Sequence, residues 1–266
     1  MVVMTQPSLF ISHGAPDLAL SAAPARSFLE TLGDTETRPD AILIASAHDE
    51  ADGVVVRAPA GFRTWHDFGN FDRRLFEMRY EPAGAPDIAD QAMALLGEAG
   101  LTPRRSDDAR LDHGAWVPLS LIYPEADIPL VTVSIDPRRD AAWHEAIGRA
   151  LAPLQDRNVL VIGSGSISHN LREVFAGRGG GHAWVESFTE WLEQKVSSGD
   201  RTALLAAMTE APDAARNHPT DEHLLPFYVA LGAGGGRGRR LHHSYTYDVL
   251  AMDAYAFGEK DVALAA

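Results

Sequence analysis

The stretch Ala41-Ile42-Leu43-Ile44-Ala45-Ser46-Ala47-His48 decides the fold that we predict for this chain. Its unbroken apolar run is typical of a strand buried on both faces, as in the central sheet of an α/β protein. Further strands of this kind are expected at Leu9–Ser12, Val54–Ala58, Pro129–Ile135 and Val159–Gly163. We therefore predict an α/β fold whose central sheet, mostly parallel or mixed, is covered by helices on both faces. We expect it to form a single domain over residues 1–266.

Segments with helical spacing alternate with these strands. Asp136-Pro137 resembles an N-cap followed by proline at the first helical position, where its missing N–H costs little. Thr220 is a candidate N-cap that would place His223 in the first turn of a helix. The expected helices are Asp17–Leu32, Asp87–Ala99, Pro137–Leu154, His182–Val196, Thr202–Met208 and Asp221–Leu231, and two late strands are expected near Leu241–Tyr247 and Ala251–Phe257.

The composition excludes several classes of protein. The 23 Lys and Arg residues against 37 Asp and Glu give a formal net charge of −14, which disfavours nucleic acid as a partner. Because the chain has no cysteine, a bound metal would need His, Asp or Glu ligands. No stretch approaches the roughly 18 apolar residues of a membrane span, and the first residues lack the pattern of a signal peptide. We expect a cytoplasmic protein, for which a homo-oligomer is possible.

Three of the predicted strands lead to a histidine. His13 follows the first strand, His48 ends the quoted stretch, and His169 comes after a Ser/Gly turn that follows Val159–Gly163. In an open α/β sheet the ligand crevice lies just beyond the carboxyl ends of the strands. Imidazoles delivered to that edge predict a metal site. The Ser/Gly run could instead cradle a phosphate, but it has no P-loop lysine and no dinucleotide-type glycine spacing.

Other histidines also occur in contexts that favour function. His113 precedes a glycine and opens a helix, and His223 follows Glu222 near a helix start. His66 lies in an aromatic loop that could line a substrate pocket. Structural or surface roles are expected for the remaining candidates, which are His144, His182, His242 and His243.

A site without thiolates would suit Fe, Zn, Mn or Ni. A three-histidine set would use His13, His48 and His223, whereas a set of two histidines and one carboxylate would need Glu222 or another acid. If Glu222 and His223 were adjacent on a helix, only one of them could face the site well. Trp65, Phe68 and Trp116 are candidates for an aromatic substrate wall, with ordinary core packing as the alternative.

Eight ordered segments resemble the DOPA-dioxygenase-type branch of the class III (LigB-like) extradiol ring-cleavage dioxygenases. The segments span about residues 8–233. They are Leu9–Pro16, Ser46–His48, His66–Gly69, Leu111–Trp116, Tyr123–Pro129, Ser134–Asp136, His169–Arg172 and His218–His223.

The resemblance implies a mononuclear metal site and a reaction that opens a catechol ring with O₂. His13, His48 and His223 match the family's metal ligands. His169 matches its acid/base histidine, which in some zinc-loaded members also lies on the metal, and His113 matches a supporting or substrate-facing histidine. Iron(II) is the usual metal of the family, and zinc is the other candidate.

This chain departs from the branch at two places. Asp49-Glu50 follows His48 where an aromatic residue such as Trp is common, and the segment before His169 is more polar than usual. Both changes affect the predicted pocket wall and therefore the choice of catechol.

Three hypotheses follow for the function. The first is an iron(II) extradiol dioxygenase, in which a histidine takes one catechol proton and later returns it. The second is a zinc hydrolase that uses the same ligands and a metal-bound water as nucleophile. The third is a metal-binding protein without catalytic activity.

Overall fold

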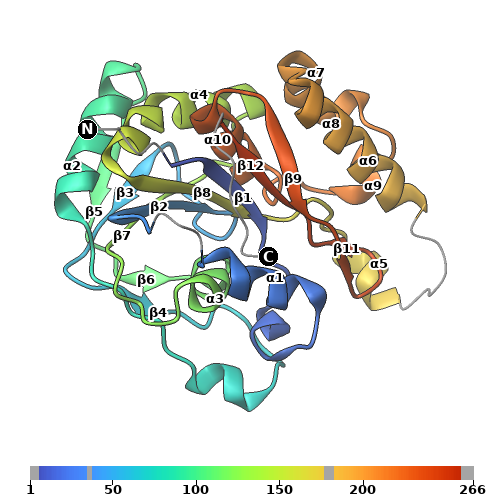
Figure 1. The fold of residues 1–266 in the computed structure, drawn as a ribbon, viewed down its shortest axis with the longest axis horizontal. Coiled ribbons are helices and arrows are strands. Elements are labelled where there is room, and N and C mark those ends of the chain that lie inside the picture. The colour runs from blue at the N-terminus through green and yellow to red at the C-terminus, as the bar shows by residue number, and fades with distance from the viewer. Residues whose placement is uncertain (1–5, 35–37, 177–182, 259–266) are drawn as a thin grey trace.

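The structure is a computed structural model that describes residues 6–34, 38–176 and 183–258. An eight-stranded sheet runs through it, in the order β5-β3-β7-β2-β8-β1-β12-β9 (Figure 1). In chain order these strands are β1 Ser8–Ser12, β2 Ala41–Ser46, β3 Val55–Arg57, β5 Arg104–Ser106, β7 Leu130–Val133, β8 Val159–Gly165, β9 Gly238–His242 and β12 Ala254–Phe257.

The middle of this sheet is parallel, and an antiparallel pair joins it to each flank, although β3 and β5 are parallel to each other. The neighbours β7, β2, β8 and β1 all run in the same direction. On one flank β12 pairs antiparallel with β1 and with β9, and on the other β3 is antiparallel to β7. The predicted α/β fold with a mixed central sheet is confirmed.

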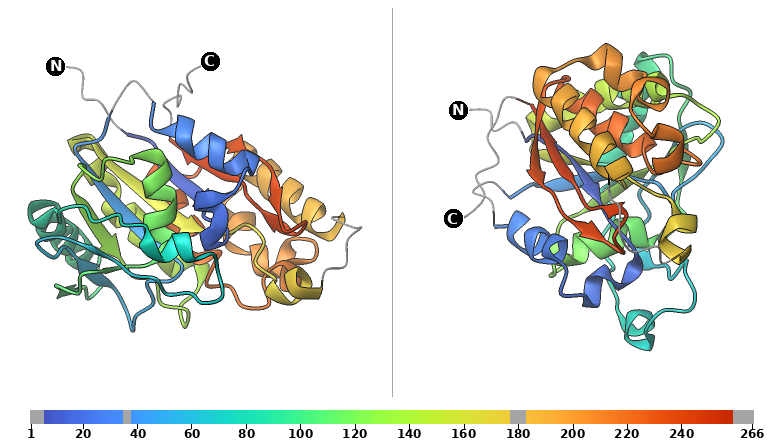
Figure 2. Two further views of the ribbon diagram at one scale, coloured as in Figure 1. Left: turned by 90° about the horizontal axis from the view of Figure 1, so that it is seen from below. Right: turned by 90° about the vertical axis from the view of Figure 1, so that its right-hand side faces the viewer.

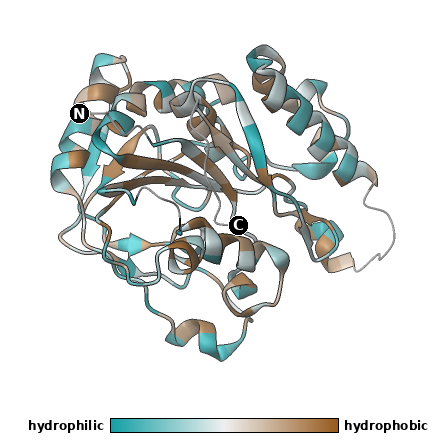
Figure 3. Ribbon diagram, in the orientation of Figure 1, coloured by the Kyte–Doolittle hydropathy of each residue, from teal (hydrophilic) through white to brown (hydrophobic). Residues whose placement is uncertain are grey.

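The central strands are buried on both faces, as their apolar runs predict. In β2, Ile42 and Ile44 pack into one apolar layer, whereas Leu43 packs into the layer on the opposite face. Helices α1 (Pro24–Leu32) and α3 (His113–Ile122) cover the first face, and α4 (Ala141–Leu151) and α10 (Leu225–Gly234) cover the second (Figure 2). In Figure 3, β2 and β8 are coloured hydrophobic over most of their length, whereas α2 and α6 carry hydrophilic residues as well.

The remaining elements surround this core. They are the helices α2 Pro86–Glu98, α5 Leu171–Ala176, α6 Ala183–Ser198, α7 Arg201–Leu205, α8 Ala207–Glu210 and α9 Ala214–Asn217, the 3-10 helices η1 Pro16–Leu20, η2 Arg73–Glu77 and η3 Ala152–Arg157, and the short strands β4 Arg63–Thr64, β6 Arg110–Leu111, β10 Tyr245–Thr246 and β11 Leu250–Ala251. None of the helices in the described part of the chain has the length and apolar character needed to cross a bilayer.

Several predicted elements are divided in the structure. The helix expected over Asp17–Leu32 is two elements, η1 and α1, because Pro24 starts a new helix at its first turn. The helix expected over Thr202–Met208 is α7 followed by α8. The two late strands are each divided as well, into β9 with β10 and into β11 with β12. His182 lies outside the described residues.

The N-cap predicted at Asp136 is wrong. Helix α4 starts later, because the side chain of Asp140 accepts a hydrogen bond from the Trp143 backbone N–H and caps it. Asp136 is buried and accepts from the backbone N–H of Arg138 and Gly53 instead. The structural role expected for His144 fits this region, since its ring bonds to the backbone of Asp140 and Asp136.

The helix predicted to begin at Asp221 starts only at Leu225, so Thr220 is not its N-cap. A helix from Asp221 would place Pro226 inside it, where proline lacks the N–H that the helix needs and clashes with the preceding turn. In α10, Pro226 instead occupies the first turn, where it is well tolerated. Residues 221–224 therefore form a turn, and this turn carries Glu222 and His223.

Two glycines allow α4 and α10 to pack at close range. A Cβ atom on Gly148 would lie 2.0 Å from the Val229 carbonyl oxygen, and one on Gly232 would lie 2.1 Å from that of Glu145. No side chain fits at either position without moving the helices apart. Since α10 also packs on β8 and β1, this contact fixes the layer behind the central strands.

We expect Gly232→Ala to lower the free energy of unfolding by about 1–3 kcal/mol, because the added methyl group overpacks the contact between α4 and α10. Urea unfolding followed by circular dichroism measures this loss. Gly97→Ala is the matched control, since an exposed Cβ there meets nothing within 4 Å and should not destabilise helix α2. Equal unfolding midpoints for Gly232→Ala and the unmodified protein would contradict the close packing.

Candidate metal centre

Five histidines meet at the edge of the sheet where β1, β2 and β8 end. His13 directly follows β1, His48 lies two residues beyond β2, and His169 lies four residues beyond β8. His113 is the first residue of α3, and His223 lies in the turn before α10. The cluster therefore occupies the crevice position that open α/β sheets use for ligands.

Glycines in β8 allow the turn with His223 to reach this edge. A Cβ atom on Gly163 would lie 2.0 Å from the Pro226 carbonyl oxygen, and one on Gly165 would lie 2.1 Å from that of His223. The backbone of the turn is then held by a 2.9 Å hydrogen bond from the Ser166 N–H to the His223 carbonyl. The Ser/Gly run thus brings a second segment of chain against the strand, which is a different role from cradling a phosphate.

Nε2 of His48 lies close to the Nε2 atoms of two other histidines. The Nε2 atoms of His13 and His48 are 3.2 Å apart, and those of His48 and His223 are 3.3 Å apart. Two nitrogens that each lie about 2.1 Å from the same ion are separated by roughly 3.0–3.4 Å, depending on the coordination angle. Both separations therefore lie in the range expected for nitrogens that share a metal ion.

Hydrogen bonds on the opposite ring nitrogens leave Nε2 free in two of these rings. The Ser164 hydroxyl donates its one proton to the Gly114 carbonyl, so at 3.1 Å it accepts from Nδ1–H of His13. Nδ1 of His223 lies 2.9 Å from a Glu222 carboxylate oxygen, which is also an acceptor. Both rings are thus held with an Nε2 lone pair directed at the point of convergence, as metal-binding histidines require.

The converging rings are uncharged near neutral pH. Burial and then the neighbouring histidines lower the pKa values of His13 and His223 well below the usual value. Burial, together with His113, lowers the pKa of His48 to about 3. Neutral imidazole is the form that binds a metal, so protons compete with a cation only weakly at pH 7.

Two carboxylates stand behind the cluster. Asp67 accepts a 3.0 Å hydrogen bond from Nδ1 of His113, and its other oxygen lies 3.9 Å from Nδ1 of His48. Glu222 faces His223 and also lies 3.8 Å from Nδ1 of His169. The expectation that only one of Glu222 and His223 could face the site is wrong, because a turn rather than a helix carries them both.

His169 lies flat against His223. Their ring centroids are 3.4 Å apart and the rings are nearly parallel, at 13°. Burial lowers the pKa of His169 as well, although a fifth of its side chain remains exposed. Among the described residues, two groups of three side chains bring their ligand atoms within 4.8 Å of one another, namely His13, His48 and His113, and His169, Glu222 and His223.

A cavity of about 230 Å³ opens beside the histidines. His48, His113, His169 and His223 line one side of it. Most of its other lining is apolar and comes from distant parts of the chain: Ala15, Pro16, Phe68, Phe71, Leu171, Phe175 and Leu250. An apolar cavity with a few convergent polar groups is typical of a small-molecule site.

Of the four side chains predicted to bind substrate, only Phe68 lines this cavity. His66 packs behind it, with ring centroids 5.8 Å from both Phe68 and Trp116. Trp116 is fully buried and donates its indole N–H to the Trp65 carbonyl. Trp65 is 39% exposed and stacks under the Arg110 guanidinium. Trp116 therefore packs in the core and Trp65 lies on the surface.

Several cavity residues were missed from the sequence. Phe71 lies in the same aromatic loop as Phe68 and could have been included on that basis. Leu171 and Phe175 lie one helical turn apart in α5, directly after His169, and are 46% and 83% exposed. Exposed apolar residues at helical spacing beside a candidate histidine are the signal that could have identified them.

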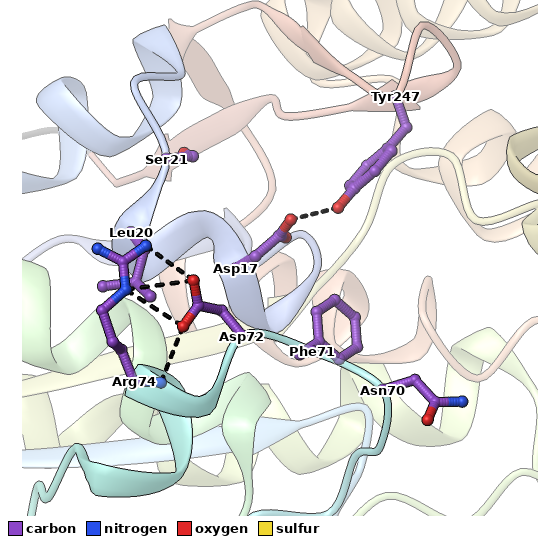
Figure 4. Close-up of a pocket in the computed structure, with 8 residues that line it drawn as sticks. All are labelled: Asp17, Leu20, Ser21, Asn70, Phe71, Asp72, Arg74 and Tyr247. Carbon is purple, nitrogen blue, oxygen red and sulfur yellow. Dashed lines mark hydrogen bonds and ion pairs between the residues drawn. The ribbon is translucent and has the colours of Figure 1, made fainter.

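A second pocket of about 440 Å³ adjoins this cavity, and Phe71 lines both (Figure 4). Its rim carries two polar contacts, a hydrogen bond from the Tyr247 hydroxyl to Asp17 and an ion pair between Arg74 and Asp72. Tyr247 has a φ of 49°, a left-handed conformation that is uncommon for an aromatic residue. This pocket is lined by more polar residues than the cavity beside the histidines.

Comparison with known proteins gives concordant matches. The model of the family described as the catalytic LigB subunit of aromatic ring-opening dioxygenase matches residues 12–258. The 4,5-DOPA dioxygenase extradiol of Beta vulgaris is 37% identical over 256 residues, covering 94% of this chain and 96% of that protein. The protein of the same name from Escherichia coli K12 is 35% identical over 234 residues, covering 87% and 86%.

A solved structure agrees with these matches. An uncharacterised protein from Escherichia coli K12 superposes with a TM-score of 0.77 at 31% identity, covering 95% of this chain and 100% of the other. The chain belongs to the LigB family, and it is an extradiol ring-cleaving dioxygenase. The resemblance inferred from the eight ordered segments is confirmed.

We expect His13→Ala, His48→Ala and His223→Ala each to lose metal binding. Changes to the partners of ligands already cost 10–100-fold in affinity, so removing a ligand should cost at least about 100-fold. Metal titration followed by calorimetry measures this effect. His242→Ala is the matched control, because His242 stacks on Phe28 outside the cluster. Full metal occupancy in any one of the three variants would exclude that residue from the ligand set.

Proposed function

We propose that this protein uses O₂ to open the ring of a catechol, beside its two hydroxyl groups, at an iron(II) ion held by His13, His48 and His223. The observation that supports it most directly is the position of His48 Nε2, which lies 3.2 Å from Nε2 of His13 and 3.3 Å from Nε2 of His223. Burial lowers the pKa of all three rings and so favours the neutral imidazole that binds a metal, which also supports the proposal. Membership of an extradiol dioxygenase family agrees with a metal of this kind.

The cavity supports an aromatic substrate. Phe68, Phe71 and Phe175 supply ring faces and edges, and Pro16 and Leu250 complete an apolar wall opposite the histidines. Aromatic rings favour offset-stacked or edge-to-face contacts with such walls. The relatives from Beta vulgaris and Escherichia coli are each named 4,5-DOPA dioxygenase extradiol, which makes DOPA the first catechol to test.

Iron(II) would supply the redox capacity that reaction with O₂ needs and a positive charge that favours the ionised catechol. Zinc would supply the charge but has no redox chemistry. The choice of iron over zinc therefore follows from the reaction, and activity should depend on which metal is loaded.

His169 is proposed as the residue that moves the protons. It lines the cavity, and burial keeps its ring neutral and able to accept a proton from a catechol hydroxyl. The carboxylate of Glu222, 3.8 Å from Nδ1, would stabilise the charged ring until the proton is returned. His113 lines the same cavity and is proposed to support this transfer by a hydrogen bond to the substrate. General acid–base catalysis of this kind typically contributes 10²–10⁴-fold in rate.

We expect the protein loaded anaerobically with Fe(II) to consume O₂ when a catechol is added, with the absorbance change of a ring-opened product. The panel would include DOPA, catechol and substituted catechols, and an oxygen electrode would follow each. Zinc-loaded protein is the matched control and should consume none. Absence of O₂ uptake across the panel, with bound iron verified, would exclude a ring-opening function. Ester hydrolysis by the zinc-loaded form would then favour the zinc hydrolase.

We expect His169→Ala to keep its metal and to lose about 10²–10⁴-fold in kcat, because the proton acceptor is removed while the converging nitrogens remain. Steady-state kinetics and metal analysis on one preparation measure both quantities. A variant with unchanged kcat would rule out the acid/base role, and one that loses its metal would make His169 a ligand instead.

A further inference from the structure

We infer that Asp67 is a positioning residue for His113, one that holds the ring in a fixed orientation with its proton on Nδ1. The part of this inference that concerns catalysis rests on the proposed function. The part that concerns the ring's tautomer stands on hydrogen bonding alone and is tested without turnover.

One oxygen of Asp67 makes two hydrogen bonds to the same residue. Its Oδ1 accepts from the backbone N–H of His113 at 3.0 Å and lies 3.0 Å from Nδ1 of its ring. The two side chains are only 7% and 9% exposed, so water competes little for these contacts. Because the backbone and the ring are both bound, His113 is fixed in orientation as well as in place.

These contacts determine which nitrogen of His113 carries the proton. A carboxylate can only accept, so the Nδ1 that faces it must be the N–H. The neutral ring then has its lone pair on Nε2. Since His113 lines the cavity, Nε2 is the nitrogen left to accept a hydrogen bond from a substrate hydroxyl.

The second oxygen links His113 to the converging nitrogens. Oδ2 of Asp67 lies 3.9 Å from Nδ1 of His48, and the ring centroids of His48 and His113 are 4.1 Å apart. A single buried negative charge thus faces two neighbouring imidazoles. Burial raises the pKa of Asp67, but the hydrogen bonds from His113 and its nearness outweigh burial and hold that pKa below the usual range.

His113 and His169 both line the cavity, but they differ in how closely a carboxylate holds the ring. The carboxylate nearest to His113 is within hydrogen-bonding distance, whereas Glu222 is 3.8 Å from His169 and bonds to His223 instead. His113 is therefore the better oriented of the two rings. In catalytic triads, an aspartate with this placement holds its histidine in the correct tautomer and orientation.

A purely structural role for Asp67 makes a different prediction. Asp67 also caps the start of α3 through the His113 N–H, and Asp112 already caps this helix through the Ala115 N–H. If capping were its only task, changes at Asp67 would lower stability without altering the ring's tautomer or kcat.

The experiment compares Asp67→Asn and Asp67→Ala with the unmodified protein. Asn keeps the size and one acceptor oxygen but removes the charge, whereas Ala removes both. Asp90→Asn is the matched control. Asp90 lies on α2, where its exposed side chain pairs with Arg105 of β5. In metal-free protein labelled with ¹⁵N, long-range correlation spectra identify the protonated nitrogen of each ring, and His113→Gln assigns the His113 signals.

We expect His113 to carry its proton on Nδ1 in the unmodified protein and in Asp67→Asn, and to shift toward Nε2–H in Asp67→Ala. With iron loaded, Asp67→Asn should keep its metal and lose about 10–100-fold in kcat with little change in KM, as for other changes of carboxylate partners. Asp90→Asn should match the unmodified protein in both readouts.

An unchanged tautomer in Asp67→Ala, or an unchanged kcat in Asp67→Asn, would overturn the inference. Loss of metal from Asp67→Asn would also overturn it, because Asp67 would then serve His48 rather than His113. If the unmodified protein opens no catechol ring, the proposed function fails, yet the spectra of the metal-free variants still decide the assignment of the tautomer.

Discussion

The close approach of two backbones, β8 and the turn that carries His223, is the constraint on which the site depends. Gly163 and Gly165 leave no Cβ in the space that the carbonyl oxygens of Pro226 and His223 occupy, at about 2 Å from where such atoms would lie. Any larger residue would push the turn outward. His223 would then leave the point where it meets His13 and His48, and the convergence of the three rings would be lost.

This constraint also explains the electrostatic character of the site. Packing the turn against β8 buries His13 and His223, and burial keeps the rings neutral and their lone pairs available. The orientation of each ring is fixed by a hydrogen bond at Nδ1, from His13 to the Ser164 hydroxyl and from His223 to the Glu222 carboxylate. The surrounding polar groups are thus as much a part of the site as the converging nitrogens.

The sequence predicted what local pattern controls. Apolar runs gave the strands, and their carboxyl ends gave His13 and His48, since a parallel sheet fixes that edge. Prediction from sequence was wrong where tertiary contacts determine the structure. Because Pro226 lies in the first turn of α10, that helix begins later than predicted and Glu222 and His223 share a turn. Trp116 is buried in the core, whereas Phe175 lines the cavity. The cytoplasmic location, the oligomeric state and the single-domain organisation remain predictions.

The position of β1 within the sheet has a consequence for how the protein matures. β1 lies between β8 and β12, so the strand that leads to His13 has no neighbours until residues 159–165 and 254–257 have been synthesised. Pairings between segments this far apart in sequence form slowly. On the ribosome, His13 and His48 therefore emerge long before His223 and before both of the strands that flank β1.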